Sequence, residues 1–240
     1  MRLSDRLAIP RGVTAVVGGG GKTSLIWRLA QELSQRATVL IATTAHIRPP
    51  ACETLLKPDP MAIRDALLRH RLLAIGDPAP EGKLAQASRL HGEYRGLADY
   101  VLIEADGSRG FPVKAPAAHE PAMPREPSLT IAVAGMSCCG RTVAQAAHRP
   151  ALYAALTGLR EQDLITPAAV AKALANPAGQ RKGVPGRFLI ILNQADTEER
   201  IAFAREVASL LTEETWIMAL TARPDWAQRG ARGPTAAGNA

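Results

Sequence analysis

The sequence predicts an α/β fold in which a mostly parallel β-sheet is flanked by helices on both faces. Short apolar runs rich in β-branched residues recur along the chain, and they are nearly continuous rather than alternating with polar residues. Such runs are typical of parallel strands that are buried on both faces. Segments between the runs carry apolar residues at helical spacing, such as Leu25, Leu29 and Leu33, which can pack on the sheet.

The predicted elements can be placed along the chain in order. The apolar runs predict strands at residues 13–17, 38–42, 72–75, 100–104, 129–134, 187–192 and 216–220. Amphipathic spacing predicts helices at residues 22–35 and 59–70. A further helical block is expected near residues 149–176, where Pro150 and Pro167 suit first-turn positions and Gly158 suits a helix end.

These elements are expected to form a single domain over residues 1–222, with the helical block near residues 149–176 as an insertion. A chain of 240 residues is long enough to bury one sizeable core. Residues 223–240 combine Gly, Pro, Ala and Arg without apolar periodicity, so they are expected to form a disordered tail.

The composition and charge of the chain argue against two classes of binding partner, nucleic acids and membranes. The formal net charge is +7, but the excess Arg is scattered, aromatic residues make up only 4% of the chain, and no Lys/Arg block reaches five residues, so no nucleic-acid partner is expected. No apolar run approaches the roughly 20 residues needed to cross a bilayer, and the N-terminus lacks the apolar stretch of a secretory signal. Three cysteines give no disulfide framework. We therefore expect a cytoplasmic protein without a membrane partner.

A glycine-rich turn joins the first predicted strand to the first predicted helix. It consists of Gly18, Gly19, Gly20, Gly21, Lys22 and Thr23, with Ser24 directly after it. Glycine N–H groups can curl around phosphate oxygens, and the helix N-terminus adds partial positive charge. Lys22 is expected to reach the outer phosphates and Thr23 to bind Mg²⁺. The sequence thus predicts a P-loop NTPase-like fold that binds a nucleoside triphosphate, ATP or GTP, with Mg²⁺.

The spacing of this turn differs from the common G-x-x-x-x-G-K-[ST] form, because Val16 stands six positions before Lys22 where that form has Gly. The shorter G-x-x-G-K-T form is similar to that of the Mur-ligase and folylpolyglutamate-synthase group. The alternative interpretation is a flexible strand-to-helix turn followed by an exposed lysine.

Two carboxylates follow the fourth predicted strand. In open α/β sheets ligands bind at the carboxyl ends of the strands, so Glu104 and Asp106 are candidates for holding Mg²⁺ with Thr23 or for orienting a nucleophile. Together with Lys22 they are the expected catalytic residues, and Asp106 with Thr23 is the expected metal pair. Asp106 and Gly107 also form a good turn dipeptide, which leaves a purely structural alternative.

Other polar residues near strand ends are candidates for binding a substrate. They are Thr43, Thr44, His46, Arg109, Lys114, His119, Glu120, His148 and Arg149. The threonines are equally explained as capping residues of the local backbone. Cys138 and Cys139 could join His side chains in a metal or substrate site, but the spacing is not diagnostic, and buried thiols with structural histidines are the simpler interpretation.

The sixth predicted strand ends in Asn193, Gln194, Ala195 and Asp196. This segment resembles the N-K-x-D motif with which GTPases read guanine, although Gln194 replaces the lysine. Asn193 and Asp196 are therefore candidate nucleotide-binding residues. Asp196, followed by Thr197 and two glutamates, would also serve as the N-cap of a helix, and the two roles are compatible.

Seven of these stretches together resemble the selenium-dependent hydroxylase accessory protein family, known as YqeC. They are residues 17–23, 43–47, 104–109, 114–117, 119–121, 148–150 and 192–196. The resemblance implies a P-loop-type nucleotide-binding protein that assists the maturation of a molybdenum hydroxylase, including selenium-dependent ones. Its implied partners are the hydroxylase or the proteins that mature its cofactor.

Three functions remain open from the sequence. The first is an accessory protein that hydrolyses ATP or GTP. The second is a small-molecule kinase or carboxylate-activating ligase, in which Arg109, Lys114 and His119 grip an anionic acceptor. The third is a nucleotide-regulated binding module without hydrolysis.

Overall fold

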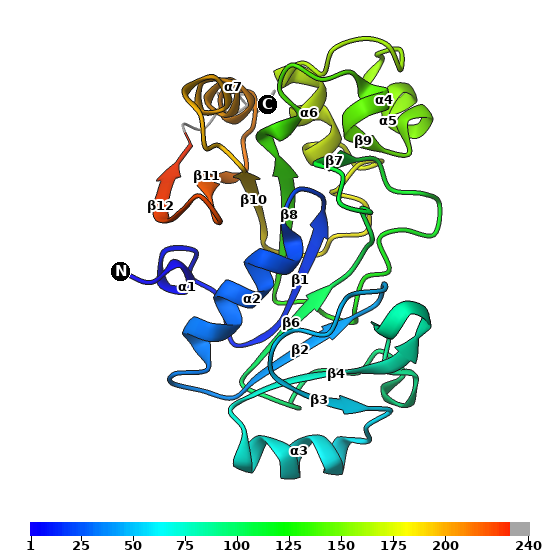
Figure 1. The fold of residues 1–240 in the computed structure, drawn as a ribbon, viewed down its shortest axis with the longest axis vertical. Coiled ribbons are helices and arrows are strands. Elements are labelled where there is room, and N and C mark those ends of the chain that lie inside the picture. The colour runs from blue at the N-terminus through cyan, green and yellow to red at the C-terminus, as the bar shows by residue number, and fades with distance from the viewer. Residues whose placement is uncertain (231–240) are drawn as a thin grey trace, which may run out of the picture.

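A computed structural model, which describes residues 1–230, contains a large central β-sheet (Figure 1). The strands of this sheet are β1 (Gly12–Gly18), β2 (Val39–Thr43), β3 (Glu53–Leu56), β4 (Leu72–Ala79), β5 (Lys83–Ala85), β6 (Tyr100–Glu104), β8 (Leu129–Gly135), β10 (Phe188–Asn193), β11 (Glu214–Ala219) and β12 (Arg223–Arg229). Their spatial order is β12-β11-β10-β8-β1-β6-β2-β4-β3, with β5 paired to β4. Within this sheet β5 and β12 pair antiparallel with their neighbours, and the other pairs are parallel. The mostly parallel sheet predicted from the sequence is thus confirmed.

A second, two-stranded sheet lies beside the large one. It is formed by β7 (Val113–Lys114) and β9 (Ala147–His148), which pair in parallel. This short pairing brings two distant loops of the chain together, because it places Lys114 opposite His148.

Helices cover both faces of the large sheet. They are α1 (Leu3–Arg6), α2 (Lys22–Leu33), α3 (Pro60–Arg69), α4 (Val143–Ala146), α5 (Pro150–Thr157), α6 (Pro167–Ala175) and α7 (Glu198–Ser209), with short 3-10 turns η1 (Pro80–Gly82), η2 (Ser88–Leu90) and η3 (Met136–Cys138). Figure 1 shows α2 crossing one face of the sheet, and α3 and α7 lying at opposite ends of the molecule. Within residues 1–230, no helix is long and apolar enough to cross a membrane.

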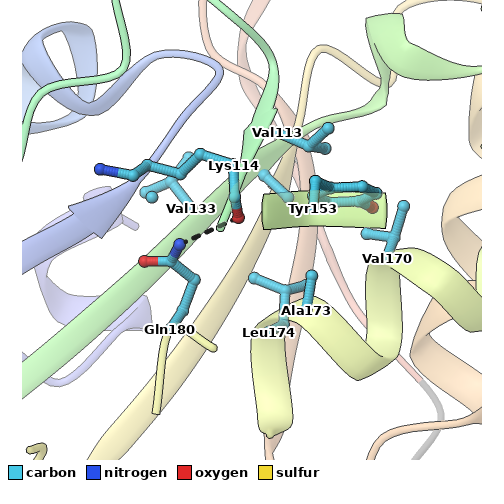
Figure 2. Close-up of a pocket in the computed structure, with 10 residues that line it drawn as sticks. Val113, Lys114, Val133, Tyr153, Val170, Ala173, Leu174 and Gln180 are labelled. Carbon is cyan, nitrogen blue, oxygen red and sulfur yellow. Dashed lines mark hydrogen bonds between the residues drawn. The ribbon is translucent and has the colours of Figure 1, made fainter. Parts of the chain in front are cut away.

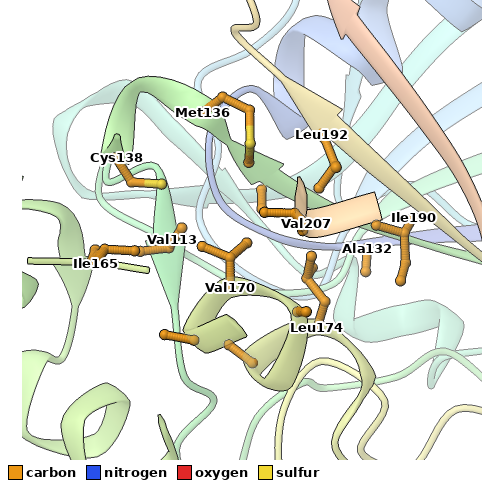
Figure 3. Packing of buried hydrophobic residues seen from close by; sticks show 14 of the residues in the cluster. Val113, Ala132, Met136, Cys138, Ile165, Val170, Leu174, Ile190, Leu192 and Val207 are labelled. Carbon is orange, nitrogen blue, oxygen red and sulfur yellow. The ribbon is translucent and has the colours of Figure 1, made fainter. Parts of the chain in front are cut away.

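The core divides into layers because neighbouring residues of a strand point to opposite faces. In β1, Val16 packs with α1 and α2, whereas Ala15 and Val17 pack with α4 to α7. Figure 3 shows part of the latter cluster, where Val170 and Leu174 of α6 and Val207 of α7 meet the strands. A third cluster packs α3 against the other end of the sheet.

The seven strands expected from the sequence are all present, with end points that differ by a few residues. The two expected helices near residues 22–35 and 59–70 are α2 and α3, and the block near residues 149–176 contains α5 and α6, with Pro150 and Pro167 in their first turns. The expectation of a disordered tail from residue 223 is wrong for its first part, because β12 pairs antiparallel with β11. Residues 231–240 of that tail lie outside the described residues.

Candidate functional site

The glycine-rich turn follows β1 and ends at the first turn of α2. Gly18, Gly20 and Gly21 have φ values of +97°, +76° and +117°, which L side chains rarely adopt. Other parts of the backbone also approach closely: a Cβ on Gly19 would lie 2.5 Å from the carbonyl oxygen of Phe111, and one on Gly20 would lie 2.3 Å from the nitrogen of Gly135. The sequence of glycines is therefore required by the packing of the loop as well as by its turns.

The N–H groups of the first three glycines have partners within the protein. Gly18 N–H donates to the Asp106 carboxylate, Gly19 N–H to the Val133 carbonyl at 2.9 Å, and Gly20 N–H to the Phe111 carbonyl at 3.1 Å. In α2 the Leu25 N–H donates to the Gly21 carbonyl. The N–H groups before Leu25 have no intrahelical partner, as at any helix N-terminus. An anion would therefore be bound by the N–H groups from Gly21 onward, which is a smaller set of donors than the whole loop expected from the sequence.

Lys22 is the first residue of α2 and is almost completely buried, with 2% of its side chain exposed. Its Nζ donates to the Gly18 carbonyl at 2.6 Å and lies 3.2 Å from Asp106 Oδ1 and 3.6 Å from Glu104 Oε1. A buried ammonium without such partners would be very costly. The two predicted acids therefore hold Lys22 at the base of the loop.

Thr23 and Glu104 form the second part of the site. Thr23 is exposed, and its Oγ1 donates to Glu104 Oε2 at 2.7 Å. Burial raises the pKa of Glu104, although the positive charge of Lys22 and the Thr23 hydroxyl favour its charged form. Ser24, next to Thr23, is also exposed in the first turn of α2. A hydroxyl and a carboxylate are hard oxygen ligands of the kind that Mg²⁺ takes.

Asp106 has a different environment from Glu104. Both of its oxygens lie within 3.1 Å of the Gly18 nitrogen, and they lie 3.2 Å and 3.0 Å from the Lys22 and Lys114 ammonium groups. None of its side chain is exposed. The structure thus brings Glu104, rather than Asp106, to Thr23, and it uses Asp106 to anchor the loop. Of the two metal candidates, this geometry favours Glu104.

A chain of alternating charges continues from Asp106 away from the loop. Lys114 Nζ donates to Glu120 Oε2 at 2.8 Å and to the Gly107 carbonyl at 2.7 Å, and Glu120 accepts two hydrogen bonds from Arg149, at 2.5 Å and 3.0 Å. Burial alone would raise the pKa of Glu120, but the bonds from Arg149 and Lys114 outweigh it and lower the pKa to about 2. Three of the predicted substrate residues are therefore engaged with one another.

The two threonines among the predicted substrate residues are engaged with the backbone. Thr43 Oγ1 donates to the Glu104 carbonyl and accepts from the Ala45 N–H, and Thr44 Oγ1 donates to the Ala122 carbonyl, so both fix local backbone. His46, Arg109 and His119 are exposed, and the positive charge of Arg109 is among those that act on His148.

His148 is buried and stacks on Phe111. Burial and the neighbouring charges of Arg149 and Lys114 hold the pKa of His148 below its usual value. His148 therefore packs against Phe111, whose carbonyl accepts the N–H of Gly20 in the glycine-rich turn.

Asn193 and Asp196 lie on the other side of the loop from Glu104. Asn193 is buried; its Nδ2 donates to the Gly20 carbonyl at 2.7 Å, and its Oδ1 accepts from the Leu220 N–H. Asn193 thus holds the loop against β10 from a buried position, with its oxygen and one of its N–H groups engaged by the protein. Asp196 is partly exposed and pairs with Arg200 at 2.6 Å, and Gln194 accepts from the Ser137 hydroxyl.

The expectation that Asp196 caps a helix is wrong. The N-cap of α7 is Thr197, whose extended backbone and side-chain oxygen receive the Arg200 N–H. Threonine is a favoured N-cap, so the helix begins one residue later than expected.

The two neighbouring cysteines follow β8. Cys138 is buried, which raises the pKa of its thiol to about 12, whereas Cys139 lies 3.9 Å from Glu199. In the described part of the chain, no three His, Cys, Asp or Glu side chains are grouped so as to hold a metal ion.

Two pockets adjoin the site, and neither was anticipated from the sequence. One lies behind the loop and is lined by residues that include Gly18, Tyr153 and Gln180 (Figure 2). Figure 2 shows the Lys114 ammonium pointing away from Tyr153, while Gln180 donates to the Lys114 carbonyl. The other opens beside Thr23 and Glu104 and has Trp27 and Arg48 among its walls. Trp27 and Arg48 belong to no motif, so no pattern in the sequence could have identified them.

Comparisons with known proteins agree on one family. A family model described as "YqeC protein" matches residues 14–151, a range that includes the glycine loop, both acids, Lys114, Glu120 and Arg149. The chain is 35% identical over 182 residues to a protein of Escherichia coli (strain K12) called "Uncharacterized protein YqeC", and the match covers 72% of this chain and 71% of that protein. No solved structure matches the chain.

Proposed function

The chain belongs to the YqeC family, and we propose that it binds a Mg²⁺-nucleoside triphosphate, ATP or GTP, at the N-terminus of α2 and hydrolyses it. The observation that carries the proposal is the convergence of Lys22, Thr23 and Glu104 at that helix end. A cation, a hydroxyl and a carboxylate at a helix N-terminus are the groups that a metal-bound phosphate chain requires.

Lys22 would move from the acids to the outer phosphates. In the structure its ammonium is already neutralised by Asp106 and Glu104, so it has no large desolvation cost left to meet when phosphate oxygens replace them. The N–H groups from Gly21 onward and the partial positive charge of the helix end would add to the binding of the anion.

Thr23 and Glu104 would hold Mg²⁺, whose charge would stabilise the negative charge that develops during phosphoryl transfer. Mg²⁺ commonly takes only one or two protein carboxylates beside phosphates and water, so these two side chains suffice as its protein ligands. Glu104 is buried at the side of the loop where the terminal phosphate would lie, and it would also orient the attacking water.

Hydrolysis would serve the role that the family resemblance implies, which is to assist the maturation of a molybdenum hydroxylase, including a selenium-dependent one. Its partners would then be the hydroxylase or the proteins that mature its cofactor.

A second candidate function has one observation in its favour. A small pocket opens beside Thr23 and Glu104, with Trp27 and Arg48 in its walls, so an acceptor for the terminal phosphoryl group would have a place to bind next to the proposed metal site. A small-molecule kinase or a carboxylate-activating ligase would use this pocket. Acceptor-dependent turnover distinguishes this function from hydrolysis, and binding without turnover points instead to a nucleotide-regulated module.

The experiment measures binding and turnover of Mg²⁺-ATP and Mg²⁺-GTP by wild type, Glu104→Gln and Asp106→Asn. We expect Glu104→Gln to lower turnover by about tenfold or more while changing affinity much less, because it weakens the metal site and the orientation of the nucleophile. If Glu104→Gln turns over normally and Asp106→Asn loses its response to Mg²⁺, the metal ligand is Asp106. Normal turnover in both variants would refute the metal site.

A further inference from the structure

Six charged side chains form one connected network at the base of the glycine loop. The acids are Glu104, Asp106 and Glu120, and the bases are Lys22, Lys114 and Arg149. Within this set the charges balance. Asp106 is shared, because it pairs with Lys22 on one side and with Lys114 on the other.

If Lys22 leaves for a phosphate chain, the network separates into a balanced chain of four side chains and Glu104 alone. Asp106, Lys114, Glu120 and Arg149 remain as an alternating chain with no net charge, held by contacts between 2.5 Å and 3.0 Å. Glu104 is then the acid that stays beside Thr23. Without Lys114, the departure of Lys22 would leave Asp106 buried without a cation, which is very costly.

We propose that Lys114 is a positioning residue for nucleotide binding: it neutralises Asp106 and so releases Lys22 to the phosphates. Lys114 acts through Asp106 and does not touch the nucleotide. The proposal rests on the proposed nucleotide site, and it gives a role to a residue that the sequence placed among substrate ligands.

The contacts around Lys114 fit this role. None of its side chain is exposed, and its ammonium has three oxygen acceptors, from Asp106, Glu120 and the Gly107 carbonyl. Its backbone is fixed by the pairing of β7 with β9, and by the Gln180 side chain, which donates to its carbonyl. Glu120 and Arg149 continue the chain and hold the ammonium in place.

The test is a charge-balance cycle with the non-hydrolysable analogues AMP-PNP and GMP-PNP and Mg²⁺, measured by calorimetry. Lys114→Met leaves the network with one excess negative charge, so Asp106 retains Lys22, and the affinity should fall by roughly tenfold to a hundredfold. The double variant Asp106→Asn/Lys114→Met removes one charge of each sign, and the amide oxygen that replaces the carboxylate can still accept the Gly18 N–H. The double variant should therefore bind the analogues within about threefold of wild type, since the net charge of the network and of the protein is unchanged.

Lys182→Met is the matched control. Lys182 donates to the carbonyls of Ala117 and Ala118, in the same segment as Glu120, but it has no carboxylate partner within the described residues. Its loss should leave nucleotide affinity near that of wild type. Equal weakening by Lys182→Met and Lys114→Met would overturn the proposal, because a general loss of positive charge would then explain both.

The remaining outcomes are also decisive. Wild-type affinity in Lys114→Met, or weak binding that persists in the double variant, would show that Lys114 does not act through Asp106. If Lys114→Met does not fold, the balanced double variant alone is compared with wild type, and weak binding by it refutes the role. Absence of binding by wild type refutes the nucleotide site itself, and with it the role of Lys114.

Discussion

The pairing of Glu120 with Lys114 and Arg149 predicts a defined dependence of stability on pH. The pKa of Glu120 falls from its usual 4.5 to about 2 in the folded protein. This difference corresponds to about 3 kcal/mol of stabilisation at neutral pH. Because the pKa is lowered on folding, the stabilisation is complete above about pH 5 and is lost as the pH falls from about 4.5 toward 2.

Glu120→Gln removes this titration, and urea unfolding from pH 7 to pH 3 measures the effect. At pH 7 the variant should be less stable than wild type by about 2–3 kcal/mol, and roughly half of that difference should be gone by pH 3. Glu93→Gln is the control, because Glu93 pairs with Arg125 on the surface with 69% of its side chain exposed. Such pairs contribute about 1 kcal/mol or less. A Glu120→Gln difference that stays constant between pH 7 and pH 3 would refute the reasoning.

Three further predictions concern the loop and its neighbours. Gly20→Ala should destabilise the protein by more than about 2 kcal/mol and abolish nucleotide binding, because the added Cβ meets the backbone of Gly135. Gly140→Ala is the control: with φ at +72° and open space around the added Cβ, it should cost only about 1–2 kcal/mol. Equal urea midpoints for the two variants would contradict this prediction. Asn193→Ala should cost about 2–3 kcal/mol in the same assay, since it leaves the Gly20 carbonyl and Leu220 N–H without their partner; a change below about 0.5 kcal/mol would show that the bonds are unimportant. Asp196→Asn should change stability by less than about 1 kcal/mol, because Asp196 is engaged in a partly exposed pair with Arg200, and it should leave the preference among GTP, ATP and XTP unchanged in a competition assay; a shift from GTP toward XTP would show instead that Asp196 reads guanine.

The central part of the fold could be predicted because its strands are continuous apolar runs. The peripheral strands could not. β3 and β5 have four and three residues, too few for a pattern, and their pairing depends on the neighbouring β4. β12 contains Pro, Asp and two Arg residues, a composition typical of a loop, and it becomes a strand because the edge of β11 offers it a partner.

The sequence predicted which residues meet at the glycine-rich turn, but not the contacts that they make there. A strand followed by glycines, lysine and threonine identifies Lys22 and Thr23, and the strand order places Glu104 and Asp106 next to them. The sequence could not show which acid forms an ion pair with which base. Lys114 reaches Asp106 only because β7 pairs with β9. Nor could the sequence show that the backbone of Phe111 takes the N–H of Gly20. Both depend on contacts between segments far apart in the chain.

The most direct test of the account is a calorimetric titration of wild type, Lys22→Met and Thr23→Val with Mg²⁺-ATP and Mg²⁺-GTP. Wild type should bind one equivalent of at least one of the two, and Lys22→Met should bind neither. Because Lys22 is buried between two acids, a thermal melt must show that its variant is folded, and Thr23→Val, at an exposed position, provides a second variant that should lose the contribution of Mg²⁺. Wild-type affinity in both variants, or no binding by wild type, would contradict the assignment of a nucleotide site to the N-terminus of α2.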